Sequence, residues 1–351
     1  MYRTGKILLI LAIAVATLFT AAGCSSESNA GQNSKKSGEI VVYSSRNENF
    51  VNPLLEKFEA DTGIKVNALH AGGGAVNRIV EEGNNVQADI FISNDISALE
   101  YLRMEGFLES FEPAGIDSID QNYRAVDNSW FALSARTRVF IFNKDLITAE
   151  EMPKIIWDLT NPQWEGQYAI TRGGNGGMIA HISALRYEWG DEKTSEWIAL
   201  VKDNAGGIME GHGDIRRAVG AGEFKFGLVN NYYYHQQLRE PTDNNVGVIY
   251  PDQGDNEMGA IINGAGVGII KDSPNRENAR LFIEWILLPE NQREFSYASM
   301  EVPVNPAIEA IGEAARITDY KVQSMPLSKL GEYFLDTKNL IEESGLDLEL
   351  R

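Results

Sequence analysis

The sequence predicts an α/β protein with a mainly parallel sheet that is covered by helices, and two observations support this prediction. From residue 40 to about residue 102, short β-rich runs alternate with segments of helical periodicity in the order β-α-β-α-β-α. A second set of strands and helices begins after Trp130. The chain is long enough to form two ordinary domains.

The first set of elements follows from apolar patterning. Leu54, Leu55 and Phe58 recur at helical spacing, and Gly63 predicts the end of their helix. The expected strands are 40–43, 64–69 and 89–92, each followed by a helix.

The second set is less regular. Strands are expected at 131–133, 139–142, 168–170, 225–229 and 260–270. Helices are expected at 178–189, around 215–219, at 275–297 and in the tail beyond 308, with a loop-and-helix region at 157–164. The strand at 225–229 is expected to lead into a run of asparagines and tyrosines.

The N-terminus has the pattern of a bacterial secretory signal. Arg3 and Lys6 precede a short apolar run, and small residues lead to Cys24, the only cysteine. This resembles a lipoprotein lipobox, with Ala21 where leucine is usual, so Cys24 is expected to be acylated. An ordinary cleaved signal is the alternative, and the apolar run is short for a transmembrane anchor.

Residues 1–23 are therefore expected to be a signal peptide and 24–38 a flexible tether rich in serine, asparagine and glycine. The mature chain contains no second cysteine, so it cannot form an internal disulfide. With 31 basic and 50 acidic residues, the net charge is -19. This charge excludes nucleic acid as a favourable partner and favours attraction of cations.

Tyr232, Tyr233 and Tyr234 directly follow Asn230 and Asn231. On a strand, successive side chains point to opposite faces, so three phenols there could not all be buried. A phenol, whose ordinary pKa is about 10, ionises at neutral pH only beside a Lewis acid or a fixed positive charge. The cluster therefore suggests a hard cation such as Fe(III). The alternative is a strand end with one ring in the core and two in solvent.

Small polar residues follow several predicted strands, at 44–48, 93–95, 173–176 and 230–234. Ligands of open α/β sheets bind at the carboxyl ends of strands, so these loops are candidates for one polar site. The glycine-rich loop also opens a helix, whose backbone N–H groups can hold an anion. Its spacing matches neither a P-loop nor a Rossmann turn. A flexible surface loop is the alternative.

Arg136 and Arg138 alternate on a predicted strand and should share one face. They can balance phenolates or a bound anion, and surface salt bridges are the alternative. The four histidines lack zinc-site spacing. No pattern of catalytic residues stands out, so the chain is not expected to be an enzyme.

Several segments resemble the ferric-ion substrate-binding proteins of ABC importers, sometimes called bacterial transferrins. These segments are VVYSSR (41–46), FEADTGIKV (58–66), ADIF (88–91), 130–144, NNYYY (230–234), GAGV (264–267) and PVNP (303–306). The resemblance implies a type II periplasmic-binding-protein fold with two lobes, two mixed sheets covered by helices, and crossing hinge strands. The implied lobes are 39–135 plus 265–308 and 136–264 plus 309–351.

The resemblance also implies the site. Tyr232 and Tyr233 match the adjacent tyrosine ligands of the family, and Asn230 matches an asparagine that holds a synergistic anion in some members. The anion-binding helix N-terminus of the family corresponds to Gly174, Asn175 and Gly176.

The chain departs from the family at three places. Asn47 and Glu48 stand where some members have histidine, or histidine and tyrosine, and Asn94 stands where others have an acidic ligand. Gly177 lies near the position of a further tyrosine. Glu48 is the preferred extra donor, and Asp95, a bound anion or water are alternatives.

The resemblance leads us to expect a monomeric, lipid-anchored protein in the periplasm or on the outer face of the cell membrane. It would capture Fe(III), with an anion such as phosphate or carbonate, for an ABC permease and its ATPase. The alternative on the same scaffold is a binder of phosphonate, sugar phosphate or another small organic anion. A secreted enzyme is a third possibility, for which the sequence offers no reactive group.

Overall fold

The computed structural model describes residues 38–72, 74–312, 314–346 and 350–351. The predicted signal peptide, Cys24 and nearly all of the tether lie outside these residues. Among the helices of the described ranges, none combines the length and the apolar character that a membrane span requires.

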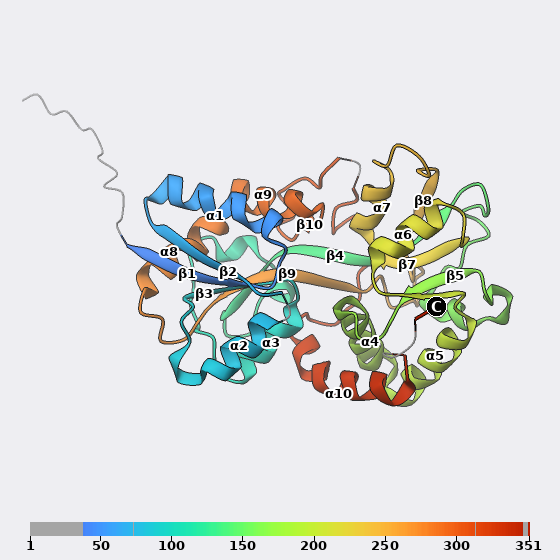
Figure 1. Cartoon of the computed structure of the whole chain (residues 1–351), viewed down its shortest axis with the longest axis horizontal. Coiled ribbons are helices and arrows are strands. Elements are labelled where there is room, and N and C mark those ends of the chain that lie inside the picture. Colours follow the sequence, from blue (N-terminus) through green and yellow to red (C-terminus); the bar gives the residue numbers. More distant parts are fainter. Residues whose placement is uncertain (1–37, 73, 313, 347–349) are drawn as a thin grey trace, which may run out of the picture. The chain divides into compact units, whose positions relative to one another are not determined.

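The first elements confirm the predicted β-α-β-α-β-α order (Figure 1). Strand β1 pairs in parallel with both β2 and β3. Gly63, at φ 79°, adopts the left-handed conformation that ends α1. The elements are β1 (Glu39–Ser44), α1 (Glu48–Thr62), β2 (Lys65–His70), α2 (Gly74–Glu82), β3 (Ile90–Ser93) and α3 (Ile96–Met104). A short 3₁₀ helix, η1 (Gly83–Asn85), lies between α2 and β3, and two more, η2 (Ile116–Ser118) and η3 (Gln121–Tyr123), follow α3.

Strand β4 (Trp130–Asn143) joins the two groups of strands. It is buried at every one of its 14 positions, and the prediction of two separate strands in this region was wrong. Its first part pairs with β9 (Ile262–Ile269) and β10 (Val302–Pro303), and its last part pairs with β7 (Phe226–Asn230) and β8 (Val246–Ile249). The strand has pairing partners from Trp130 to Asn143, and its residues are buried on both faces along its whole length.

The second group of elements combines parallel and antiparallel pairing. Strand β5 pairs in parallel with β6 and β7, whereas β7 and β8 are antiparallel to β4. Helix α5 and strands β6 and β8 had not been predicted. The remaining elements here are η4 (Ile156–Thr160), η5 (Pro162–Trp164), β5 (Tyr168–Thr171), α4 (Gly176–Trp189), α5 (Asp191–Asn204), β6 (Gly207–Met209), α6 (His212–Gly220) and α7 (Asn231–Gln237).

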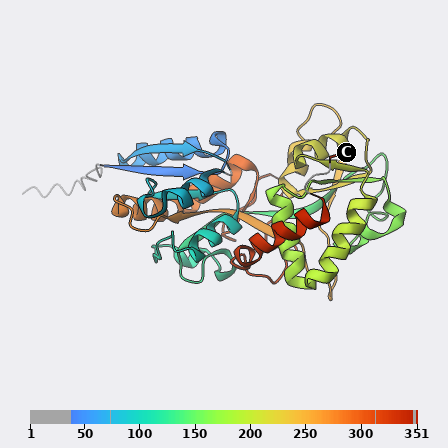
Figure 2. The same cartoon turned by 60° about the horizontal axis from the view of Figure 1, so that its bottom comes forward.

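The C-terminal helices differ from the prediction. Instead of one helix at 275–297, the chain forms α8 (Arg276–Ile286) and α9 (Pro289–Ser299). Pro289 lacks the N–H that a continuing helix would use, and it stands at the first position of the new one. The tail beyond 308 contains one described helix, α10 (Lys329–Ser344), which packs on both α3 and α4 (Figure 2).

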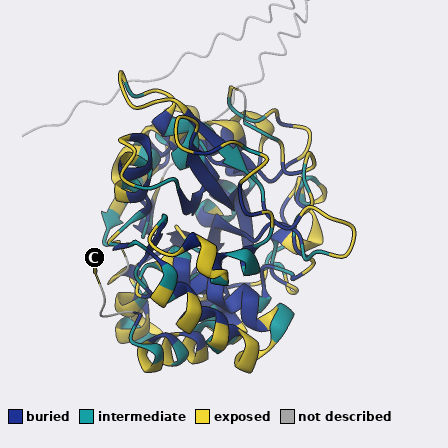
Figure 3. Cartoon of the chain, turned by 90° about the vertical axis from the view of Figure 1, so that its right-hand side faces the viewer, coloured by how far each residue is buried: buried dark blue, intermediate teal, exposed yellow. Residues whose placement is uncertain are grey.

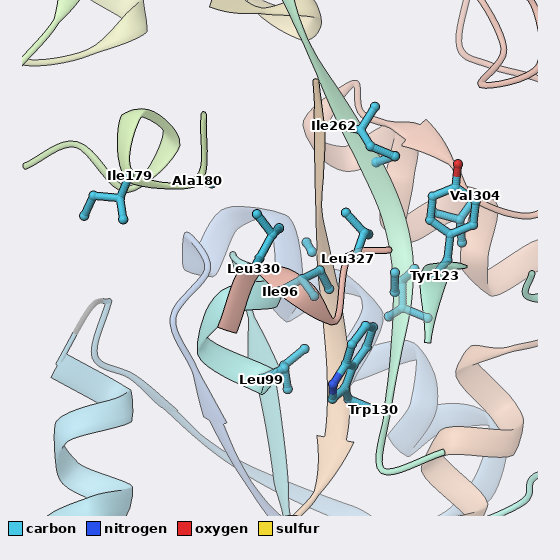
Figure 4. Close-up of a cluster of buried hydrophobic side chains, with 14 of the residues drawn as sticks. Ile96, Leu99, Tyr123, Trp130, Ile179, Ala180, Ile262, Val304, Leu327 and Leu330 are labelled. Atoms are coloured by element: carbon cyan, nitrogen blue, oxygen red, sulfur yellow. The ribbon is translucent and has the colours of Figure 1, made fainter. Parts of the chain in front are cut away.

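The apolar strands are buried, and the exposed residues gather on helices and loops (Figure 3). One apolar cluster contains Trp130 from β4, Leu99 from α3, Leu330 from the first turn of α10 and Leu327 just before that helix (Figure 4). The Trp130 indole N–H donates to Glu100 Oε2 over 2.7 Å. This bond satisfies the polar atom of a fully buried tryptophan.

Asp252 lies in the connection from β8 to β9 and is buried there. Its Oδ2 accepts a hydrogen bond of 3.1 Å from the backbone N–H of Ile156, at the start of η4. Burial raises the pKa of Asp252 to about 7, and Glu257 and Asp158 act in the same direction. The carboxylate is therefore less stable in the folded protein than in the unfolded chain.

We expect Asp252→Asn to increase the free energy of unfolding at pH 8 by roughly 1–3 kcal/mol and to change it little at pH 4. The folded pKa is raised, so the wild type loses stability as pH rises between about 4 and 7, and asparagine cannot ionise. Asparagine also tolerates the positive φ of 59° at this position. Urea unfolding at both pH values measures the effect, with the exposed Asp255→Asn as control. An equal gain at pH 4 and pH 8 would contradict the assignment.

Candidate functional site

Tyr232 and Tyr233 lie in the first turn of α7, directly after β7. Their ring centroids are 4.4 Å apart, with an interplanar angle of 33°. All three consecutive tyrosines are half-buried on a helix, so the alternative of a strand end with one core ring and two solvent-facing rings was wrong. At the first residue of the helix, Asn231 Oδ1 accepts the backbone N–H of Thr137 over 2.9 Å, which ties α7 to β4.

Arg136 and Arg138 come from the part of β4 that lies beside α7. Each is only 4% exposed, and Arg138 is in register with Asn230 on β7. The prediction that they share one face is confirmed, since both line the same small cavity. The burial of Arg136 and Arg138 excludes the alternative that they form surface salt bridges. Both guanidinium groups lie close enough to Tyr232 and Tyr233 that a phenolate at either position would raise the pKa of Arg136 and Arg138.

Arg136 is held by acidic partners. Its Nη2 lies 3.3 Å from Asp95 Oδ2, and its Nη1 lies 3.5 Å from Glu301 Oε1. Burial alone would lower the pKa of Arg136, but Glu301 and Asp95 outweigh it and the pKa is raised. Arg136 is therefore a compensated charge.

Glu301 connects Arg136 to the loop after β1. Its Oε2 lies 3.1 Å from Arg46 Nη1 and also accepts the Ser134 hydroxyl. Burial raises the pKa of Glu301, but Arg46 and Arg136 lower it more, and the net shift is downward. Two guanidinium groups and the carboxylates of Glu301 and Asp95 thus balance one another.

The positive charge of Arg138 is not balanced by a carboxylate in the same way. Its Nη1 lies 2.9 Å from His212 Nε2, and its Nη2 donates to the carbonyl of Gly177. Across the described part of the chain, no carboxylate forms an ion pair with it. Burial, with Arg136 nearby, lowers the pKa of Arg138 to about 9, which still leaves it charged at neutral pH.

A cavity of about 10 Å³ lies between these groups, enough for about one water molecule. Its polar lining comes from Arg136, Arg138, His181, Asn230 and Asn263. Asn230, predicted from its place before the tyrosines, is therefore brought together with both arginines.

The glycine-rich loop leads into α4, and Gly177 in the first turn of this helix lines the same cavity. Asn175 caps this helix, and its Oδ1 accepts the N–H of Gly177 over 2.9 Å. Gly174 and Gly176 are exposed beside it. A Cβ at Gly177 would lie 2.9 Å from His212 Nε2 and 3.0 Å from Arg138 Nη2. A side chain at 177 is therefore excluded unless that pair moves.

The two acidic candidates are placed differently. Glu48 is exposed at the first position of α1, and it makes no hydrogen bond or ion pair to Tyr232 or Tyr233 within the described residues. Asp95 caps α3 and also binds Arg136 and Asn263, the latter at 2.6 Å. The ranges that the structure describes contain no cluster of three histidine, cysteine or acidic residues suited to a metal.

His212, Glu301 and Asn263 had not been singled out from the sequence. His212 stands at the start of a helix without any motif, and Glu301 lies two residues before the segment 303–306, with no local pattern that connects it to Arg46 or Arg136. Their relevance comes from contacts over long sequence separations. Together, these residues place two adjacent phenols beside one buried, uncompensated guanidinium, an arrangement suited to hard cations with oxygen ligands and to anions.

The family model of bacterial extracellular solute-binding proteins matches residues 85–320. The chain is 30% identical to iron uptake protein A1 of Synechocystis sp., over 88% of this chain and 87% of that protein. It is 27% identical to an Fe(3+)-binding periplasmic protein of Serratia marcescens, over 88% and 90%. The solved structure of Trichodesmium IdiA (FutA) with iron and citrate ligands matches with a TM-score of 0.77 at 29% identity, covering 88% of this chain and all (100%) of that one. The described elements and these matches agree on a two-lobed, type II periplasmic-binding-protein fold.

We expect Glu301→Gln to lower the free energy of unfolding by roughly 3–5 kcal/mol at pH 7, because it leaves Arg46 and Arg136 buried with one carboxylate fewer. The folded pKa of Glu301 is lowered, so its stabilisation is present above its ordinary pKa and disappears as pH falls below that value. The difference from wild type should therefore shrink in acid. Denaturant unfolding from pH 7 to pH 3 measures it, with the exposed Glu294→Gln on α9 as control. Similar stability of both variants at pH 7 would contradict this account.

Proposed function

Because this chain belongs to the family of bacterial extracellular solute-binding proteins, we propose that it captures Fe(III) outside the cytoplasm. It delivers the ion to an ABC permease and its ATPase and catalyses no reaction itself. The observation that carries the proposal is the pair of adjacent phenols, Tyr232 and Tyr233, beside Arg138, whose charge has no carboxylate partner among the described residues. The names of the relatives given above support the choice of ferric iron.

Tyr232 and Tyr233 bind the ion as phenolates. Burial and the neighbouring Tyr232 raise the pKa of Tyr233 above its ordinary value, so this phenol stays protonated at neutral pH in the metal-free protein. Fe(III) displaces the phenolic protons because it is a strong Lewis acid. Arg136 and Arg138 stabilise the resulting negative charge, and burial strengthens their attraction.

A small anion such as phosphate or carbonate completes the coordination. In the proposal, Asn230, Arg136 and Arg138 hold it from the strands, and the α4 N-terminus at Gly174, Asn175 and Gly176 holds it from the other side. The charges support a dianion, because Fe(III), two phenolates, a dianion and the charge of Arg138 sum to zero before the carboxylate of Glu48 is counted. Glu48 is a further oxygen donor, contributed when the two lobes close.

The lobes of this proposal are residues 39–135 plus 265–308 and residues 136–264 plus 309–351. The protein acts as a monomer. Acylated Cys24 anchors it to the membrane after removal of residues 1–23, and residues 24–38 form the tether. Such an anchor keeps the captured ion close to the permease.

We expect Tyr232→Phe and Tyr233→Phe each to weaken Fe(III) binding by more than about 100-fold and to abolish the visible phenolate-to-iron charge-transfer band. The loss should exceed the ~10–100-fold typical of residues that only support a ligand. Titration of the purified protein with ferric citrate, followed by absorbance, measures both effects.

Tyr234→Phe is the matched control, since it removes a phenol from the same turn of α7 and should keep the band. A wild-type protein that stays colourless would refute the proposal. If calorimetry then showed binding of a phosphonate or sugar phosphate to the metal-free protein, the small-anion alternative would replace it.

We expect Cys24→Ser to release the protein from the membrane, because the only thiol available for acylation is lost. Labelling with a fatty-acid analogue, followed by separation of membrane and soluble fractions, measures the effect. Ser25→Ala, beside the modified position, is the control and should stay with the membrane. Wild-type protein without label in the soluble fraction would show that the signal is an ordinary cleaved one.

A further inference from the structure

His212 is a buried histidine that the proposed binding of Fe(III) has not used. Its ring lies 5.3 Å from the ring of Tyr233, with an interplanar angle of 31°. On its edge, Nε2 lies 2.9 Å from Arg138 Nη1. His212 therefore contacts both a phenol and the cation beside it.

The two arginines of β4 differ in the chemistry of their partners. Arg136 meets the carboxylates of Asp95 and Glu301. Arg138, two residues later on the same face, meets an imidazole and a backbone carbonyl. A guanidinium group has no acceptor, so the imidazole nitrogen that faces it must be an unprotonated acceptor. His212 thus satisfies the hydrogen bonding of Arg138 without cancelling its charge.

The surroundings of this pair are buried, and no carboxylate of the described residues forms an ion pair with Arg138, although Asp95 acts on it electrostatically from farther away. His181 lines the same cavity as Arg138 and is 1% exposed, and neither of its ring nitrogens has a hydrogen-bond partner among the residues that the structure describes. Gly177 leaves no room for a Cβ beside His212 and Arg138. The imidazole and the guanidinium are consequently buried and packed closely against Gly177.

We propose that His212 is a positioning residue that holds Arg138 through a neutral acceptor, so that the charge of Arg138 remains available to the phenolates of Tyr232 and Tyr233. The inference rests on the proposed function and explains why this position carries no carboxylate. A carboxylate at 212 would form an ion pair with Arg138 and compete with the phenolates for its charge. Deprotonation of the phenols by the metal would then become less favourable.

The test compares His212→Gln, His212→Leu and His212→Glu with wild type. Glutamine keeps a neutral acceptor, leucine removes the acceptor, and glutamate supplies a counter-ion. Each protein is titrated with ferric citrate, and the intensity of the charge-transfer band is followed as a function of pH. Thermal unfolding of the metal-free proteins checks that each variant folds.

We expect His212→Gln to bind within a few-fold of wild type and His212→Leu to bind ~10–100-fold more weakly. His212→Glu should bind ~10–100-fold more weakly and also raise the pH midpoint of band formation by about one unit, which corresponds to a tenfold change. If the glutamate variant does not fold, the contrast between glutamine and leucine decides the question.

Wild-type affinity with an unchanged pH midpoint in His212→Glu would overturn the inference. So would equal losses in the glutamine and leucine variants, since a packing role alone would not distinguish them. Both outcomes presuppose a band in the wild type. Absence of that band would instead count against the proposed function, so the two failures are distinguishable.

Discussion

The site depends on two guanidinium groups buried two residues apart on one strand. A charge removed from water is costly unless it is paired or hydrogen-bonded, and two like charges on one face increase that cost. The two arginines are stabilised differently. Arg136 forms ion pairs with Asp95 and Glu301, whereas Arg138 is hydrogen-bonded only to neutral acceptors among the described residues. One positive charge therefore remains buried without a counter-ion among the described residues.

This residual charge explains why phenols suit the position beside it. A carboxylate would be ionised at neutral pH and would pair with Arg138 permanently. A phenol is neutral until a strong Lewis acid removes its proton, so it supplies negative charge only when the metal is present. In the proposed site, binding of the metal and compensation of the charge of Arg138 are thereby coupled. The same coupling favours a trivalent ion, which polarises two phenols more strongly than a divalent ion does.

Strand β4 makes this arrangement possible because it belongs to both groups of strands. Its first part pairs with β9 and β10, and its last part pairs with β7, which leads into the tyrosines. Arg136 and Arg138 lie close to the change from one set of pairings to the other. Residues from α3, α4, α7 and the segment after α9 can therefore reach the same two side chains.

The sequence by itself determined the local features: the alternating elements of the first half, the strand before the tyrosines, the shared face of Arg136 and Arg138, and the glycine-rich start of α4. These depend on periodicity and on residues within a few positions, which the sequence displays directly. Only the tertiary structure decided that β4 is one strand and that Tyr232 and Tyr233 lie on a helix. It also brought Glu301 to Arg136 and His212 to Arg138, across 165 and 74 positions. Such contacts depend on how distant strands pair and on which polar groups are buried together, and no local pattern in the chain records either.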